Sequence, residues 1–89
     1  MGRKEKVTRI IDGDTFKTNR RKKSVRLANV DAPEKGQRGA PQARKDLGEL
    51  IQDQEVYIDT VARDKYGRSV ANVKVGRRSV NKAMRERLT

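Results

Sequence analysis

The feature that most constrains the fold is a series of five short runs in which aliphatic and polar residues alternate, interrupted once by a run with helical spacing. Alternation with a period of two is typical of β-strands that bury one face. Between the third and fourth runs, apolar residues instead recur every three or four positions after a proline, which predicts an α-helix. The expected strands are residues 6–11, 14–18, 24–30, 55–61 and 68–75, and the expected helix is residues 41–53.

A second, shorter helix is expected near the end of the chain. Gly76 begins a turn, Ser79 is a suitable N-cap, and an apolar stripe with helical spacing follows, formed by Val80, Met84 and Leu88. Three strands, a helix, two strands and a helix make the element order of an oligonucleotide/oligosaccharide-binding (OB) barrel. The predicted fold class is therefore β-rich α+β. It is one domain over residues 1–89, a five-stranded OB barrel with a helix between strands 3 and 4 and a short C-terminal helix.

The composition restricts the chemistry before any motif is considered. The 89 residues include no cysteine and no histidine, which excludes disulfides, thiolate zinc sites, imidazole ligands and histidine acid–base catalysis. Any bound metal must be held by oxygen, which favours calcium, magnesium or manganese. Phe16, Tyr57 and Tyr66 are the aromatic residues, so the core is expected to be aliphatic and thin.

The chain is strongly basic, with 23 Lys and Arg against 12 Asp and Glu and a net charge of +11. Such a charge favours polyanionic partners, nucleic acid first and an anionic membrane second. A basic ribosomal or chromatin-type structural protein would have the same charge. No stretch is apolar enough to span a membrane, and residues 1–6 lack the apolar segment of a signal peptide. The expected location is therefore cytoplasmic by default, or secreted if the chain has been processed at its N-terminus.

The first candidate motif is Ile11-Asp12-Gly13-Asp14-Thr15. Asp-Gly is a common hairpin turn, so a purely structural role is the simpler interpretation of this segment alone. An aspartate directly after such a turn can, however, project a carboxylate rigidly from the start of the next strand. Asp14 is therefore a candidate site residue.

The second motif runs from Arg26, inside the third predicted strand, to Asp31-Ala32-Pro33-Glu34 at its end. Asp31 could instead be a helix N-cap, with Glu34 completing a capping box and Pro33 in the first turn. That alternative does not explain Arg26. An arginine and two carboxylates where a strand leaves the sheet could hold a cation and a phosphate together.

The third motif is Asp64-Lys65-Tyr66-Gly67-Arg68. It could be an ordinary turn in which Gly67 supplies a positive φ. It would also place Arg68 at the mouth of the fifth strand, beside Lys65 and Tyr66. The basic run at residues 20–23 is expected to be a solvated turn that contacts phosphates non-specifically, without a catalytic role.

In order and spacing, the three motifs together resemble the staphylococcal (thermonuclease-like) nuclease family over nearly the whole chain, from about Val7 to Leu88. The family's members are OB barrels that use one calcium ion to hydrolyse DNA and RNA, typically leaving 3′-phosphates. The resemblance also implies roles for individual residues. Metal-binding positions are matched by Asp14, Asp31 and Ala32, the last through its main-chain carbonyl. Catalytic positions are matched by Arg26, Glu34 and Arg68, and positions that contact nucleotide phosphate by Lys65 and Tyr66.

Phosphodiester hydrolysis requires this mixture of charges. Two carboxylates can hold Ca²⁺ while leaving positions open for water and a phosphate oxygen. Glu34 could accept a proton from that water or only orient it. Arginine offers a planar, permanently charged fork to phosphate oxygens, which lysine cannot reproduce.

The main alternative is a non-catalytic OB-type module that binds single-stranded nucleic acid. Such modules stack bases on aromatic side chains along a basic groove, and three aromatic residues are few for that purpose. The acids also argue against it, because carboxylates in a phosphate groove repel the ligand unless a cation joins them. Larger family members continue beyond the position of Thr89, and their loop at residues 35–40 is longer. A monomer that prefers single-stranded or melted DNA and RNA and relies on charge is therefore expected.

Overall fold

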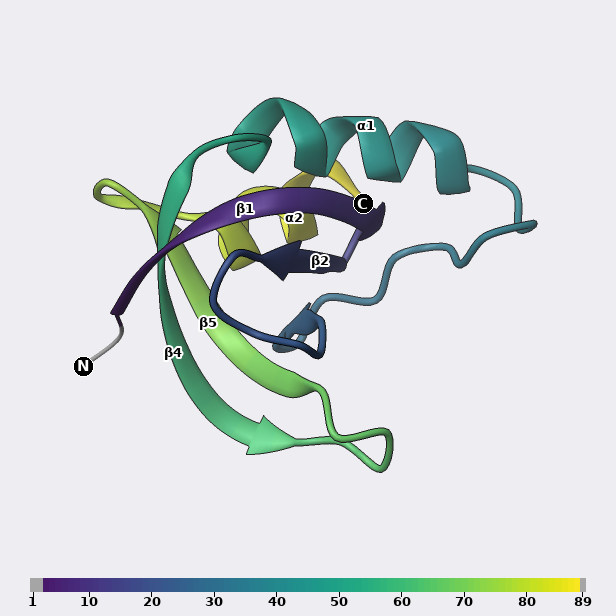
Figure 1. The fold of residues 1–89 in the computed structure, drawn as a ribbon. Helices are drawn as coiled ribbons and strands as arrows, with labels where there is room; N and C mark the ends of the chain where they lie inside the picture. Colours follow the sequence, from purple (N-terminus) through teal and green to yellow (C-terminus); the bar gives the residue numbers. More distant parts are fainter. Residues whose placement is uncertain (1–2, 89) are drawn as a thin grey trace.

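A computed structural model describes residues 3–88 of the chain (Figure 1). Its elements, in chain order, are β1 (Arg3–Asp12), β2 (Thr15–Thr18), β3 (Val25–Leu27), α1 (Ala40–Ile51), β4 (Glu55–Arg63), β5 (Ser69–Val75), β6 (Arg78–Ser79) and α2 (Val80–Arg87).

The strands form one six-stranded sheet in the order β3-β2-β1-β4-β5-β6, with antiparallel neighbours. β3, at one end of this order, also pairs in parallel with β5. The hydrogen-bonded order therefore returns on itself, and β1, β4 and β5 are strongly curved (Figure 1). The prediction of a β-rich chain with two helices is confirmed.

The predicted strands need corrections: β1 begins at Arg3 instead of residue 6, and β4 continues to Arg63 instead of ending at residue 61. The sequence predicted five strands, but Arg78 and Ser79 form a sixth, β6, paired with Val75 and Lys74 of β5. Gly76 adopts φ 58°, which allows the chain to reverse within two residues. The third strand was expected to run to residue 30 but ends at Leu27, since Asn29 takes the left-handed conformation at φ 58°.

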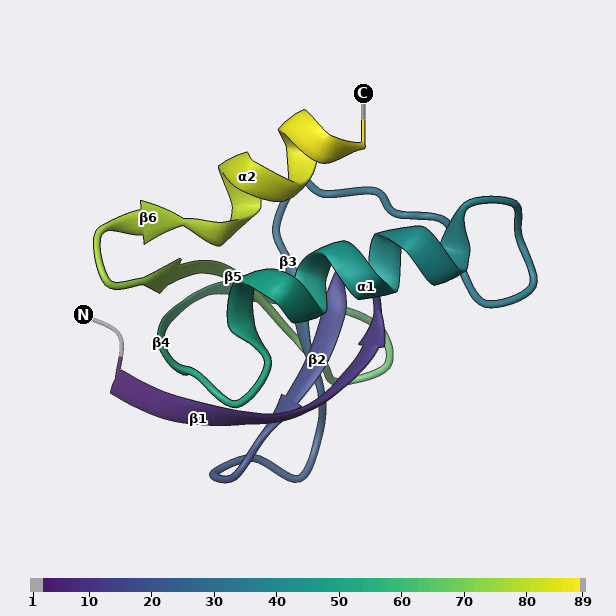
Figure 2. The same ribbon diagram turned by 90° about the horizontal axis from the view of Figure 1, so that it is seen from above.

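The two helices cover the curved sheet, as the view from above shows (Figure 2). α1 packs against β1 and α2, and α2 packs against β5. The enclosed core is aliphatic apart from Phe16 and Met84, which confirms the expected composition. Pro41 lies in the first turn of α1, and the Ser79 hydroxyl caps α2 by accepting from the Lys82 amide at 3.2 Å, both as predicted. No helix within residues 3–88 is long and apolar enough to cross a membrane.

The turn between β2 and β3, residues 19–24, is fastened to the sheet by a buried ion pair. Glu5 is 4% exposed and accepts hydrogen bonds from the Arg21 guanidinium at 2.8–3.0 Å and from the Thr18 hydroxyl at 2.7 Å. Arg21 also donates to the Ser69 hydroxyl at 2.9 Å. The expectation that residues 20–23 form a wholly solvated turn is therefore wrong for Arg21, whose charge pairs with a carboxylate 16 positions earlier.

Candidate active site

The Asp14 carboxylate is buried just after the turn between β1 and β2. A Cβ at Gly13 would lie 2.6 Å from the Ala43 Cβ and 2.9 Å from the Ala32 Cβ, so this close approach of turn, helix and loop requires glycine. Asp14 accepts from the Thr15 hydroxyl at 2.9 Å and from the Ala32 amide at 3.2 Å. Both carboxylate oxygens are therefore held, and one of them lies beside the main chain of the loop that follows β3.

Arg26 lies against this carboxylate. Its Nη2 is 3.5 Å from Asp14 Oδ2 and donates to the Val30 carbonyl at 3.2 Å. The pairing of Thr15 with Arg26 between β2 and β3 brings these side chains together. The structure thus gathers three of the predicted site residues, Asp14, Arg26 and Ala32.

Arg68 directly precedes β5, which pairs in parallel with the strand that carries Arg26. In the parallel pairing of β3 with β5, Arg26 is opposite Val70, and the residues on either side of both are buried. Arg26 and Val70 therefore project outward, and the alternation of side chains along a strand leads us to expect Arg68, two positions before Val70, on the same side. The main-chain pairing thus places the start of β5, directly after Arg68, beside the strand that carries Arg26.

The turn before β5 holds Arg68 in place. Its guanidinium donates to Asp64 Oδ2 at 2.6 Å and lies 5.4 Å from the centre of the Tyr66 ring, and the Lys65 amine lies 5.2 Å from the same ring. Gly67 adopts φ 82°, as predicted for this turn. Tyr66 is 64% exposed, so its side chain is accessible to a nucleotide base.

Asp64 positions Arg68, a role that was not predicted from the sequence. Its Oδ1 accepts from the amides of Tyr66 and Arg68, and its Oδ2 binds the Arg68 guanidinium. Partial burial would raise the pKa of Asp64, but the hydrogen bonds from Arg68 and the two amides hold the pKa below the usual aspartate value. The spacing of four residues between Asp64 and Arg68, an acid and an arginine flanking a glycine turn, was the signal for this pair.

The other two predicted acids, Asp31 and Glu34, lie in the exposed loop between β3 and α1. Within residues 3–88, neither carboxylate has a hydrogen-bond or ion-pair partner, whereas the main chain of Glu34 is tied to Gln37. The alternative in which Asp31 caps a helix is wrong, because α1 begins at Ala40 with Gly39 at its N-cap. Asp31 directly precedes Ala32, whose amide bonds to Asp14, and the loop therefore meets the buried carboxylate at this point.

No three acidic side chains converge into a metal-sized cluster in the described part of the chain. The group that the fold does bring to Asp14 is the main chain at Ala32, and Asp31, whose carboxylate is unpaired within the described residues, directly precedes it. Carboxylate and main-chain carbonyl oxygens are hard ligands of the kind that calcium takes. The residues present therefore fit an oxygen-bound divalent cation by donor type.

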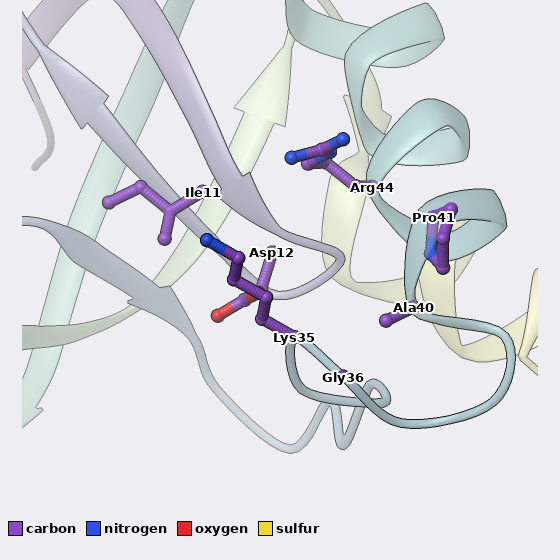
Figure 3. A pocket seen from close by; sticks show the side chains of 7 residues that line it. All are labelled: Ile11, Asp12, Lys35, Gly36, Ala40, Pro41 and Arg44. Carbon is purple, nitrogen blue, oxygen red and sulfur yellow. The ribbon is translucent and has the colours of Figure 1, made fainter.

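A cavity of about 210 Å³ lies beside the β1–β2 turn, where β1 ends and α1 begins (Figure 3). Lys35 extends across it toward Ile11 and Asp12, while Arg44 and Pro41 face it from α1. None of the eight residues predicted to bind metal or substrate lines this cavity.

Comparison with known proteins agrees with the motifs. The model of the family described as staphylococcal nuclease homologue matches residues 24–87. A micrococcal nuclease of Shigella flexneri is 45% identical over 69 residues, covering 75% of this chain and 40% of the relative. Protein ParB of Escherichia coli is 39% identical over 69 residues, covering 75% and 39%. An uncharacterized endonuclease of Haemophilus influenzae is 36% identical over 83 residues, covering 89% and 46%.

The chain thus spans less than half the length of these relatives. The family model, in contrast, covers most of the chain and includes both predicted arginines and the exposed acidic loop. The protein therefore belongs to the staphylococcal nuclease homologue family.

Proposed function

We propose that this protein is a calcium-dependent nuclease that hydrolyses phosphodiester bonds of DNA and RNA. The observation that carries the proposal is that the Ala32 amide and the Arg26 guanidinium both lie within hydrogen-bond or ion-pair distance of Asp14. Arg68 directly precedes β5, which pairs with the strand of Arg26. A buried carboxylate next to an arginine lets a cation and a phosphate bind side by side, which binding by charge alone does not require. The names of the nuclease and endonuclease relatives support the same chemistry.

We further propose that the scaffold is an OB barrel. The parallel pairing of β3 with β5 supports this assignment, because it joins two strands that lie apart in the sheet order. α1 follows β3 and precedes β4 in the chain, as in the expected barrel. The predicted site then lies on the outer face of the β3–β5 pair, where closure of the sheet would hold it rigid.

In this proposal Asp14, Asp31 and the Ala32 carbonyl hold one Ca²⁺, which would polarise a phosphate oxygen and lower the pKa of a bound water. Asp14 is already fixed by the Thr15 hydroxyl and the Ala32 amide. Asp31 is exposed and unpaired, so its carboxylate can turn toward Asp14 without breaking a bond within the described residues.

Arg26 and Arg68 would bind the nonbridging oxygens of the scissile phosphate and stabilise the charge that develops on them. Both side chains are partly exposed, at 28% and 29%, so a phosphate can reach them. Glu34 would accept a proton from the attacking water or orient it. Its carboxylate is exposed, so a water molecule can reach it.

The substrate would be single-stranded or melted nucleic acid, bound by a monomer. Lys65 and Tyr66, both exposed on the hairpin that carries Arg68, would contact the adjoining nucleotide. With a net charge of +11 and one exposed aromatic ring on this hairpin, binding would depend more on charge than on stacking. Products with 3′-phosphates are expected from the family.

The test is cleavage of denatured DNA and of RNA with Ca²⁺ or with excess chelator. Cleavage should require the cation, and Arg26→Lys and Glu34→Gln should each reduce the rate by about a hundredfold to a thousandfold. Arg77→Lys and Glu55→Gln, conservative changes at exposed positions outside the site, are the matched controls and should cut like the wild type.

Two outcomes would contradict the proposal. Gel retardation without cleavage under every divalent cation would identify a non-catalytic binding module instead. Undiminished cleavage by Glu34→Gln would show that Glu34 does not act on the attacking water.

A further inference from the structure

A cavity lined mainly by cations lies between the turn at residues 19–24 and the hairpin that joins β4 to β5. Its volume is about 210 Å³, and its lining residues are Arg21, Lys22, Lys23, Arg63 and Ser69. Four of the five are cations, and they come from segments some 40 positions apart in the chain. None belongs to the proposed catalytic or metal-binding set.

The charges around this cavity are largely unneutralised. Arg21 pairs with Glu5 and donates to Ser69, which fixes that wall. Lys22, Lys23 and Arg63 have no acidic partner among the described residues. The acid next to Arg63 in the chain, Asp64, binds Arg68 instead.

Main-chain contacts hold two of these cations in place. The Lys23 amine donates to the Tyr66 carbonyl at 3.5 Å, and Arg63 donates to the Gly67 carbonyl at 3.4 Å. Like charges that converge on a cavity repel one another unless an anion joins them. The cavity therefore has the charge and the size of a site for a phosphate group.

We propose that this cavity binds a backbone phosphate of a nucleic-acid strand, at a distance from the scissile phosphate. The proposal deepens the proposed function, since the strand would be the nuclease substrate. Lys23 contacts the same hairpin that carries Tyr66 and Arg68, so a strand bound at Arg68 can continue over the exposed Tyr66 ring toward this cavity. That adjoining aromatic ring favours a nucleotide chain over a free phosphate ion.

The experiment measures binding of a labelled single-stranded oligonucleotide of about 12 nucleotides by fluorescence anisotropy with excess chelator. The pocket variant is Lys22→Gln with Arg63→Gln, which leaves Arg21 and its ion pair intact. The matched control, Lys74→Gln with Arg77→Gln, removes the same charge from exposed positions at the β5–β6 turn.

Loss of one phosphate contact should weaken binding about fivefold at 0.1 M salt and reduce the slope of log Kd against log salt by about 0.7, beyond the control. Circular dichroism melting shows whether the pocket variant is folded, and Lys22→Gln alone, at an exposed side chain, provides a second variant.

Equal affinities of the folded pocket variant and the control would overturn the proposal. It would also be overturned if inorganic phosphate shifts the Ser69 amide resonance while the oligonucleotide leaves it unchanged, because the cavity would then bind a free ion. Cleavage is absent from this assay, so a protein that binds here without ever cutting would refute the nuclease proposal and leave this one standing.

Discussion

Replacement of Glu5 by glutamine tests whether a buried carboxylate fastens the 19–24 turn to the sheet. Glu5 accepts four hydrogen bonds, three from Arg21 and one from Thr18, and is 4% exposed. Glutamine keeps the shape of the side chain and one acceptor oxygen but removes the charge. Arg21 is then left with a half-buried guanidinium and no ionic partner within the described residues.

The magnitude follows from the burial of the two partners. Breaking a fully buried ion pair costs about 3–5 kcal/mol, and hydrogen bonds to charged groups contribute about 1.5–3 kcal/mol each. The Arg21 side chain is 26% exposed, so water can replace part of the lost interaction, and we expect the free energy of unfolding to fall by about 2–3 kcal/mol. A domain of this length has a free energy of unfolding of about 4–13 kcal/mol. The variant should therefore melt roughly 10–20 °C below the wild type.

The assay is urea unfolding at neutral pH, followed by circular dichroism. Glu55→Gln is the control, because Glu55 is exposed on β4 and its side chain has no partner within residues 3–88. If Glu5→Gln shifts the midpoint no more than Glu55→Gln does, the ion pair contributes little and the reasoning is refuted.

The effect should also depend on pH. Burial raises the pKa of Glu5, but hydrogen bonds from Arg21 and Thr18 outweigh it and hold the pKa below the usual glutamate value. The unfolded chain then takes up the proton at a higher pH than the native state. The stabilisation is therefore complete above the usual glutamate pKa and is lost as pH falls through the lower native value. The difference between wild type and Glu5→Gln should shrink below about pH 5, and a difference that stays constant down to about pH 3 would contradict this pKa assignment.

Three further substitutions test the packing around the proposed site. Gly13→Ala should destabilise the protein by about 1–3 kcal/mol, since its Cβ would lie 2.6 Å from the Ala43 Cβ, and a wild-type melting temperature would show that the turn can move away. Gly48→Ala, inside α1, should instead stabilise the protein by about 0.5–1 kcal/mol in the same melting assay, because alanine favours a helix and its Cβ would lie 3.8 Å from Ile10 Cγ1, an ordinary contact distance. Asn81→Ala should cost about 2–4 kcal/mol in urea unfolding, because the buried amide bonds three main-chain groups; a loss below about 0.5 kcal/mol would mean that water replaces them.

The regular part of the fold was predictable because local patterns specify it. Alternation marked the core faces of β4 and β5, and the helical spacing of Ala43, Leu47 and Leu50 marked the buried face of α1. β6 was not predictable in the same way, because two residues are too short to show a period. Its formation depends on the Gly76 turn and on the free edge of β5.

Parts of the site depend on pairing that no local pattern contains. The ion pairs of Glu5 with Arg21 and of Arg26 with Asp14 join residues 16 and 12 positions apart. Strand register sets the second pair, since Thr15 pairs with Arg26, whereas the first depends on the 19–24 turn, whose Asn19 bonds to Lys6 of β1. A run of four basic residues gave no indication that one of them would be half-buried. The ion pair of Asp64 with Arg68 was easier to predict, because the two residues are four positions apart within one turn.

Both proposed phosphate ligands are held by carboxylates in this structure, and the two pairings differ in their consequences. Arg68 is held by Asp64, a residue outside the proposed metal site. If a phosphate replaces Asp64 as the partner of the Arg68 guanidinium, the turn can stay intact, because Asp64 still accepts from the amides of Tyr66 and Arg68. Arg26 is held by Asp14, which the proposal also assigns to the cation. Arg26 would therefore turn from Asp14 to the phosphate as Asp14 takes up the cation, and the two binding events should favour each other. Substrate affinity should accordingly rise with Ca²⁺ by more in the wild type than in Arg26→Gln. An equal rise in both proteins would show that Arg26 does not couple cation binding to phosphate binding.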